Sequence, residues 1–164
     1  MELRKKIDKV LEYSLVGILA ILVLDVLWQV ASRYLLSSPS TFTDELAGFL
    51  LIWVALLGAA YVTGQKQHLA IELIINKVNA RKANTLRIII QAAVIVFTLF
   101  VMVVGGIWLI YTRFYLGQVS AALQLPLGYV YMVLPISGVF IIYYSIVNSM
   151  ELINSLKVAK KVAQ

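Results

Sequence analysis

Four long stretches of the sequence consist almost entirely of apolar residues, with polar or charged segments between them. They cover approximately residues 10–36, 43–64, 88–112 and 127–150. A helix needs roughly 20 apolar residues to cross the hydrocarbon core of a bilayer, and none of these stretches alternates with the period of two that a strand requires. The pattern predicts an all-α integral membrane protein, with four transmembrane helices in a single membrane domain, residues 1–164.

The composition supports this prediction. Hydrophobic residues make up 62% of the chain and charged residues 13%, and the mean hydropathy is +0.91. Ordinary soluble domains carry about 25% charged residues, and a chain of 164 residues is too small to bury this much apolar surface within itself. The excess must face lipid or another protein.

The first apolar stretch follows a basic segment, as a secretory signal peptide would. No small-residue cleavage site follows it, however, and the helical pattern continues to Leu36. We therefore expect an uncleaved first transmembrane helix.

The basic residues predict the orientation of the helices. Twelve of the fourteen lysines and arginines lie before the first stretch, between the second and third, or after the fourth. Only Arg33 and Arg113 lie at the opposite ends, so the positive-inside rule predicts that both termini are cytoplasmic. Because the charges flank apolar stretches and form no single patch, no nucleic-acid partner is expected, whereas membrane lipids are.

The connection between the second and third stretches predicts a short interfacial amphipathic helix over about residues 69–79. At about 100° per residue, five apolar side chains share one face of this segment and three polar ones share the other. The apolar residues are Ala70, Ile71, Ile74, Ile75 and Val78, and the polar residues are Glu72, Asn76 and Asn79. A cytoplasmic helix packed on a partner protein is the alternative.

The first predicted helix carries a polar stripe formed by Asp25, Gln29, Ser32 and Arg33, with Trp28 at its border. A carboxylate near the middle of the membrane costs a few kcal/mol and needs a partner. Asp25 could couple ions or relay protons, or it could form a polar packing contact within this chain or with another subunit. Packing is favoured, because no second intramembrane carboxylate or lysine accompanies it.

Two acids, Asp44 and Glu45, open the second predicted helix. The spacing of Thr41 and Asp44 fits a capping pattern, and the helix dipole favours negative charge in the first turn. The acids could be simple caps, could pair with Arg33, or could face a partner outside the membrane.

Other residues suggest helix packing more than chemistry. Pro135 should kink the fourth helix, either for close packing or as a break in a substrate site. The chain has no cysteine and one histidine, His68, which is too few for the usual zinc or bis-histidine haem sites. No catalytic motif is present, so the sequence predicts no enzyme, no cofactor and no metal site.

The order of several residues resembles the small membrane subunit of tripartite ATP-independent periplasmic (TRAP) transporters. The resemblance is carried by "ASRYLLSSPSTFTDELAGFLLIWVALLGAAYVTGQKQHLAIELI" and "ALQLPLGYVYMVLPISG". Its features are Arg33 with Tyr34, Glu45, Trp53, and His68 followed by an acid. The segment "QKQHLAIEL" departs from the family, which usually has a small residue and an aspartate around this histidine.

The resemblance implies a multi-pass scaffold subunit in the bacterial inner membrane. A large multi-helix subunit would hold the solute and sodium sites, and a periplasmic solute-binding protein would deliver an organic acid. This chain would brace the large subunit through interface residues. The candidates are Asp25, Trp28, Gln29, Arg33, Asp44, Glu45, Trp53, His68 and Pro135.

Two other functions are considered from the residues alone. One is a self-contained four-helix exporter that acts as a homodimer around Asp25. The other is a membrane oxidoreductase subunit that holds haem or quinone, for which His68 alone offers little.

Overall fold

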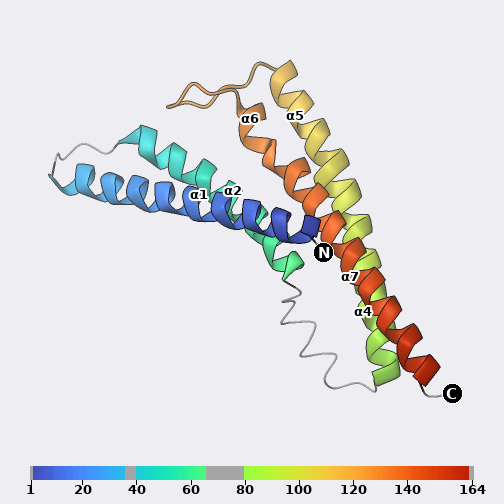
Figure 1. The fold of residues 1–164 in the computed structure, drawn as a ribbon. Helices are drawn as coiled ribbons and strands as arrows, with labels where there is room; N and C mark the ends of the chain where they lie inside the picture. The colour runs from blue at the N-terminus through green and yellow to red at the C-terminus, as the bar shows by residue number, and fades with distance from the viewer. Residues whose placement is uncertain (1, 36–39, 66–79, 163–164) are drawn as a thin grey trace.

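The computed structural model describes residues 2–35, 40–65 and 80–162, and it is helical over nearly all of them (Figure 1). The longest non-helical segment in this part of the chain is residues 116–126, which contains an isolated antiparallel bridge between Val119 and Pro126. The helices are α1 (Glu2–Leu35), α2 (Thr41–Gly64), α4 (Ala80–Phe97), the π-helix η1 (Thr98–Val104), α5 (Gly105–Tyr115), α6 (Leu127–Tyr131) and α7 (Val133–Val162).

Four helical stretches are long and apolar enough to cross a membrane, which confirms the four predicted spans. They are Arg4–Leu35, Thr41–Gly64, Leu86–Tyr115 and Leu127–Asn154. The third is continuous through α4, η1 and α5. The predicted interfacial helix, residues 69–79, lies outside the described residues, and the cytoplasmic placement of the termini stays a prediction.

The helices form two arms that diverge from a common junction (Figure 1). In the first arm, α1 packs along α2. In the second arm, α7 packs against α4 and η1, and α6 packs against α5. The C-terminal half of α2 joins the arms by packing on α7, whereas its N-terminal half leads away from the second arm.

The buried core is small and lies at the junction of the arms. One cluster comprises Leu11, Leu57, Val133 and Tyr144, and a second comprises Ala60, Met102 and Ile141. In the most apolar part of the α1 span only 11% of the residues are buried, against 39% in the span that contains α7. Most apolar side chains therefore face outward, where lipid or another protein must cover them.

Glycine allows the helices of the second arm to approach closely. A Cβ atom at Gly106 would lie 3.0 Å from Cδ of Pro135, and one at Gly138 would lie 3.0 Å from Cγ2 of Val103. Both separations are shorter than ordinary van der Waals contact. The contact also shows that Pro135 packs against α5.

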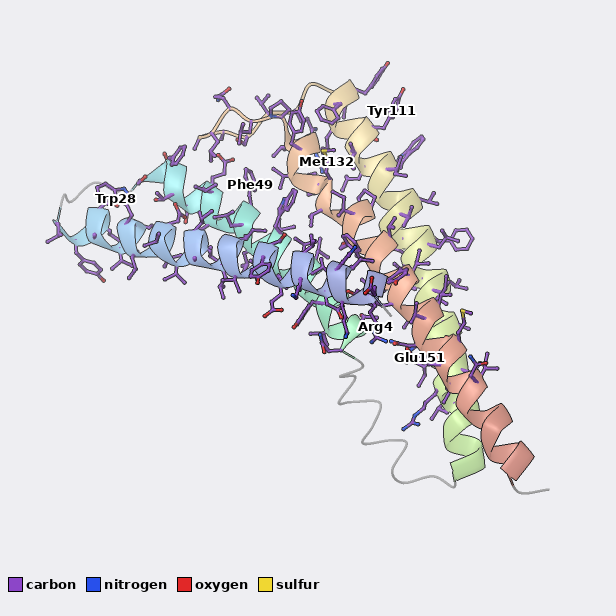
Figure 2. The ribbon with its side chains drawn as sticks, viewed as in Figure 1. Arg4, Trp28, Phe49, Tyr111, Met132 and Glu151 are labelled. Carbon is purple, nitrogen blue, oxygen red and sulfur yellow. The ribbon has the colours of Figure 1, made fainter. Side chains whose placement is uncertain are left out.

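The last span is interrupted at Met132, between α6 and α7, as Pro135 predicted (Figure 2). Proline has no N–H and its ring crowds the preceding turn, so a helix breaks or kinks just before it. At this break the indole Nε1–H of Trp53 donates a hydrogen bond to the carbonyl of Val130, at 3.0 Å. This hydrogen bond at the break thus connects α2 to the second arm.

We expect Gly106→Leu to lower the stability of the chain, because the added side chain must displace Leu134 and Pro135. Overpacking of this kind typically costs about 1–3 kcal/mol. Gly48→Leu is the matched control, since a Cβ atom there would meet nothing within 4 Å. Thermal unfolding in detergent micelles measures both variants, and equal midpoints would contradict the close packing described here.

Candidate functional site at the ends of the two arms

The connection between α5 and α6 forms a short hairpin, residues 116–126, which we call the bridging hairpin. Its two sides are paired by hydrogen bonds from Ser120 N to Leu125 O, at 2.8 Å, and from Leu127 N to Gln118 O, at 3.0 Å. Gly117 and Gln124 turn the chain with φ angles of +58° and +57°. Figure 1 shows that the hairpin reaches from the end of α5 toward the start of α2.

The carboxylate of Glu45 holds the tip of this hairpin. It accepts three backbone N–H groups, from Ala121 at 3.1 Å, Ala122 at 2.8 Å and Leu123 at 2.9 Å. Successive N–H groups that converge in this way form a concave site for an anion. An ionised Glu45 fills that site, so the first arm is tied to the second; we call this contact the Glu45 clamp.

Asp44 has a different role from its neighbour. Its Oδ1 accepts a hydrogen bond of 2.8 Å from Nε2 of Gln29, which links α2 to α1. The N-cap of α2 is Ser40, whose side chain accepts the N–H of Thr43 at 3.4 Å. The predicted cap at Thr41 is therefore wrong by one residue, because Thr41 already has helical conformation and Asp44 faces α1.

The proposed pairing of Arg33 with the two acids is also wrong. Asp44 binds Gln29 and Glu45 binds the hairpin, and neither acid forms an ion pair with Arg33. Arg33 is exposed and lines a hollow beside Gln29 and Asp44. Its charge remains available at the surface of the first arm.

Two residues of the polar stripe, Asp25 and Ser32, are buried in the structure, whereas Arg33 at its end is exposed. Asp25 is 8% exposed and Ser32 is 3% exposed, whereas Trp28 at the border is 58% exposed. Oδ2 of Asp25 has no hydrogen-bond partner within the described part of the chain. Burial of Asp25 is compatible with both its packing and its proton-relay interpretations, so both stay predictions, whereas Trp28 faces the surroundings of the chain.

A second set of polar side chains, which sequence reasoning missed, lies where the C-terminus of α2 meets α1 and α7. Arg4 donates to the carbonyl of Gly64 and pairs with Glu151 at 3.1 Å (Figure 2). Nδ2 of Asn148 donates to the carbonyl of Thr63 at 3.0 Å. These side chains satisfy carbonyl groups that the C-terminus of α2 leaves without helical partners.

Tyr144 completes this group, which we call the vertex cluster. Its hydroxyl donates to the Asp8 carboxylate, and its fully buried ring lies against Gly64, where a Cβ atom would be 2.8 Å away. The guanidinium of Arg4 lies 6.0 Å from the centre of the same ring. The sequence showed Arg4 only as one of several basic residues near the terminus, because its partners lie far away along the chain.

The structure thus places Gln29, Asp44 and Glu45 near the bridging hairpin. It places Trp53 and Pro135 at the break between α6 and α7. His68 lies outside the described residues. Each contact in the clamp and the vertex cluster satisfies a backbone or side-chain polar group across a helix junction. The arrangement fixes the shape of the molecule, which suits a subunit that packs against another protein.

The sequence of this chain is similar to those of known membrane transport proteins. The family described as "Tripartite ATP-independent periplasmic transporters, DctQ component" matches residues 22–155. A protein of Haemophilus influenzae named as a TRAP transporter small permease protein is 27% identical over 135 residues, which cover 82% of each chain. The sialic acid TRAP transporter small permease protein SiaQ of Vibrio cholerae is 30% identical over 103 residues, or 63% of this chain and 60% of that protein.

The family match extends over most of the chain and includes the clamp residue Glu45, the α6–α7 break and much of the vertex cluster. Together with the four apolar helices it identifies a multi-pass membrane protein. The chain belongs to the DctQ component family, the small permease subunits of tripartite ATP-independent periplasmic transporters.

Proposed function

We propose that this chain is a scaffold subunit that braces a large transport subunit in the bacterial inner membrane. The complex would take up an organic acid together with sodium, after a periplasmic binding protein delivers the solute. Family membership supports a role in transport rather than catalysis. The name of the Vibrio cholerae relative, a sialic acid transporter subunit, is consistent with an acidic solute.

The observation that carries the proposal is a fixed shape with uncovered apolar surfaces. The vertex cluster holds the two arms where they meet, and the Glu45 clamp ties the start of α2 to the bridging hairpin of the second arm. Large apolar side chains remain exposed on both arms, for example Tyr13 at 73% and Trp108 at 71%. A rigid, apolar and divergent pair of arms is suited to lie against a larger membrane protein and to limit its movement.

The polar ends of the arms suggest how the periplasmic protein would be received. If both termini are cytoplasmic, then Arg33, Asp44 and the bridging hairpin lie on the periplasmic side. Arg33 is exposed and makes no ion pair with Asp44 or Glu45. An exposed cation at this edge would attract an acidic patch on the docking protein and raise its rate of association.

We expect Glu45→Gln to destabilise the assembled transporter, because the amide replaces a charged acceptor for three N–H groups. Hydrogen bonds to a charged group contribute about 1.5–3 kcal/mol. The measurement is the thermal stability of the small and large subunits co-purified in detergent. Asp44→Asn is the control, because an amide oxygen can still accept the hydrogen bond from Gln29.

The variants should separate clearly, with Glu45→Gln losing stability and co-purified large subunit, and Asp44→Asn close to wild type. The solute affinity of the binding protein should stay the same in both. Wild-type stability and wild-type recovery of the large subunit in Glu45→Gln would argue against the scaffold proposal.

We expect Arg33→Ala to weaken docking of the binding protein without weakening assembly, because this side chain contributes charge rather than packing. In vesicles that contain the complex, the apparent KM for the loaded binding protein should rise, and more so at low salt. Lys6→Ala removes an exposed charge at the predicted opposite face and serves as the control. An unchanged KM at low salt would count against a docking role for Arg33.

A further inference from the structure

A groove runs along the second arm beside the close contact of Gly106 with Leu134 and Pro135. Gly105 and Gly106 form its floor, Val101, Leu109 and Leu134 line its sides, and Arg113 lies at one end. Gly105 leaves the floor open, since a Cβ atom there would meet only the carbonyl oxygen of Phe100, at 3.5 Å. Apart from its arginine end, the groove is lined almost wholly by apolar groups.

The length of the groove matches one leaflet of a bilayer. Arg113 lies twelve positions after Val101 in the sequence, which corresponds to about 18 Å along a helix. Half of a typical hydrocarbon core is about 15 Å. One extended acyl chain therefore fits between the apolar end of the groove and the arginine.

Arg113 lacks an anionic partner. Its Nη1 donates to Oε1 of Gln118, a neutral group, and its guanidinium lies 5.5 Å from the centre of the Tyr131 ring. Nε is buried and has no acceptor, and Arg113 forms no ion pair, among the side chains that the structure describes. The other guanidinium N–H groups can donate charge-assisted hydrogen bonds to a carboxylate or phosphate oxygen.

Aromatic residues beside the groove mark its depth in the membrane. Trp108, Tyr111 and Tyr115 follow one another on the exposed face of α5, with ring centres 6.2 Å and 5.9 Å apart. Tryptophan and tyrosine gather where the headgroups begin. Arg113 lies within this part of α5, whereas the glycine floor lies deeper in the hydrocarbon region.

We propose that this groove binds an anionic phospholipid. The phosphodiester contacts the Nη2 group of Arg113, and one acyl chain lies over Gly105. The negative headgroup supplies the counter-charge that Arg113 lacks, and the apolar lining selects a lipid over free phosphate. The site does not depend on the transported solute or on the bracing role, so it goes beyond the function proposed above.

The test is lipid retention by the complete small and large subunits, co-purified in detergent and incubated with phosphatidylglycerol. Native mass spectrometry counts the bound lipids. Arg113→Gln should lower retention about tenfold or more, the loss that follows removal of a charge-assisted hydrogen bond. Arg33→Gln removes the other arginine predicted on that side of the membrane and should leave retention at the wild-type level.

A second variant tests the acyl chain separately from the charge. Gly105→Leu fills the floor while Arg113 stays in place, and it should also lose the lipid, whereas Gly105→Ala should retain most of it. Circular dichroism confirms that each variant is folded, and inorganic phosphate at matched concentration should not displace the lipid.

Three outcomes would overturn the proposal. The first is equal lipid retention by Arg113→Gln and wild type, and the second is full retention by folded Gly105→Leu. The third is a loss of large subunit, without any change in lipid, in Arg113→Gln, because this would show that an acidic group of the partner covers Arg113. A failure of the bracing role would instead appear in the Glu45 variant with lipid retention intact.

Discussion

The contact between the Glu45 carboxylate and three backbone N–H groups of the bridging hairpin determines how the two arms sit relative to each other. In a bilayer, apolar helices gain little by leaving lipid for each other, because acyl chains are as apolar as leucine. Polar contacts and close packing must therefore fix the geometry. Glu45 supplies such a contact where α2 leads away from the second arm, between residues more than 70 positions apart in the sequence.

Other contacts stabilise the helix packing at the C-terminus of α2 and along the second arm. The vertex cluster satisfies the C-terminal carbonyls of α2 with Arg4 and Asn148. The indole of Trp53 binds at the break in the last span, and glycines 106 and 138 bring α5 and η1 against α7. These contacts hold the exposed apolar faces in one arrangement, which is the feature on which the proposed bracing role depends.

The length of the apolar stretches predicted the four spans well, because a membrane imposes length and apolarity on each helix independently of its neighbours. Helical periodicity placed Asp25 and Ser32 on one face of α1, and both residues are buried in the structure. Pro135 marked the break because its effect on a helix is local.

Partners at long range were beyond sequence reasoning. Asp44 and Glu45 are adjacent and chemically similar, yet one binds Gln29 and the other binds the hairpin, because successive helical residues point in different directions. In the sequence, Arg4 indicated only the orientation of the first helix, and nothing there showed that it binds the C-terminal carbonyl of α2. The π-helix Thr98–Val104 left no sign in the sequence, since its apolar residues suit an α-helix equally well.

The most direct test of a rigid brace is the distance between the arms in the assembled complex. The chain has no cysteine, so Tyr34→Cys and Tyr115→Cys, both at exposed positions, allow spin labels on α1 and α5 for pulsed electron paramagnetic resonance. The account predicts one narrow distance distribution that broadens when Glu45→Gln is added. A broad distribution in the parent, or an unchanged narrow one in the Glu45 variant, would contradict it.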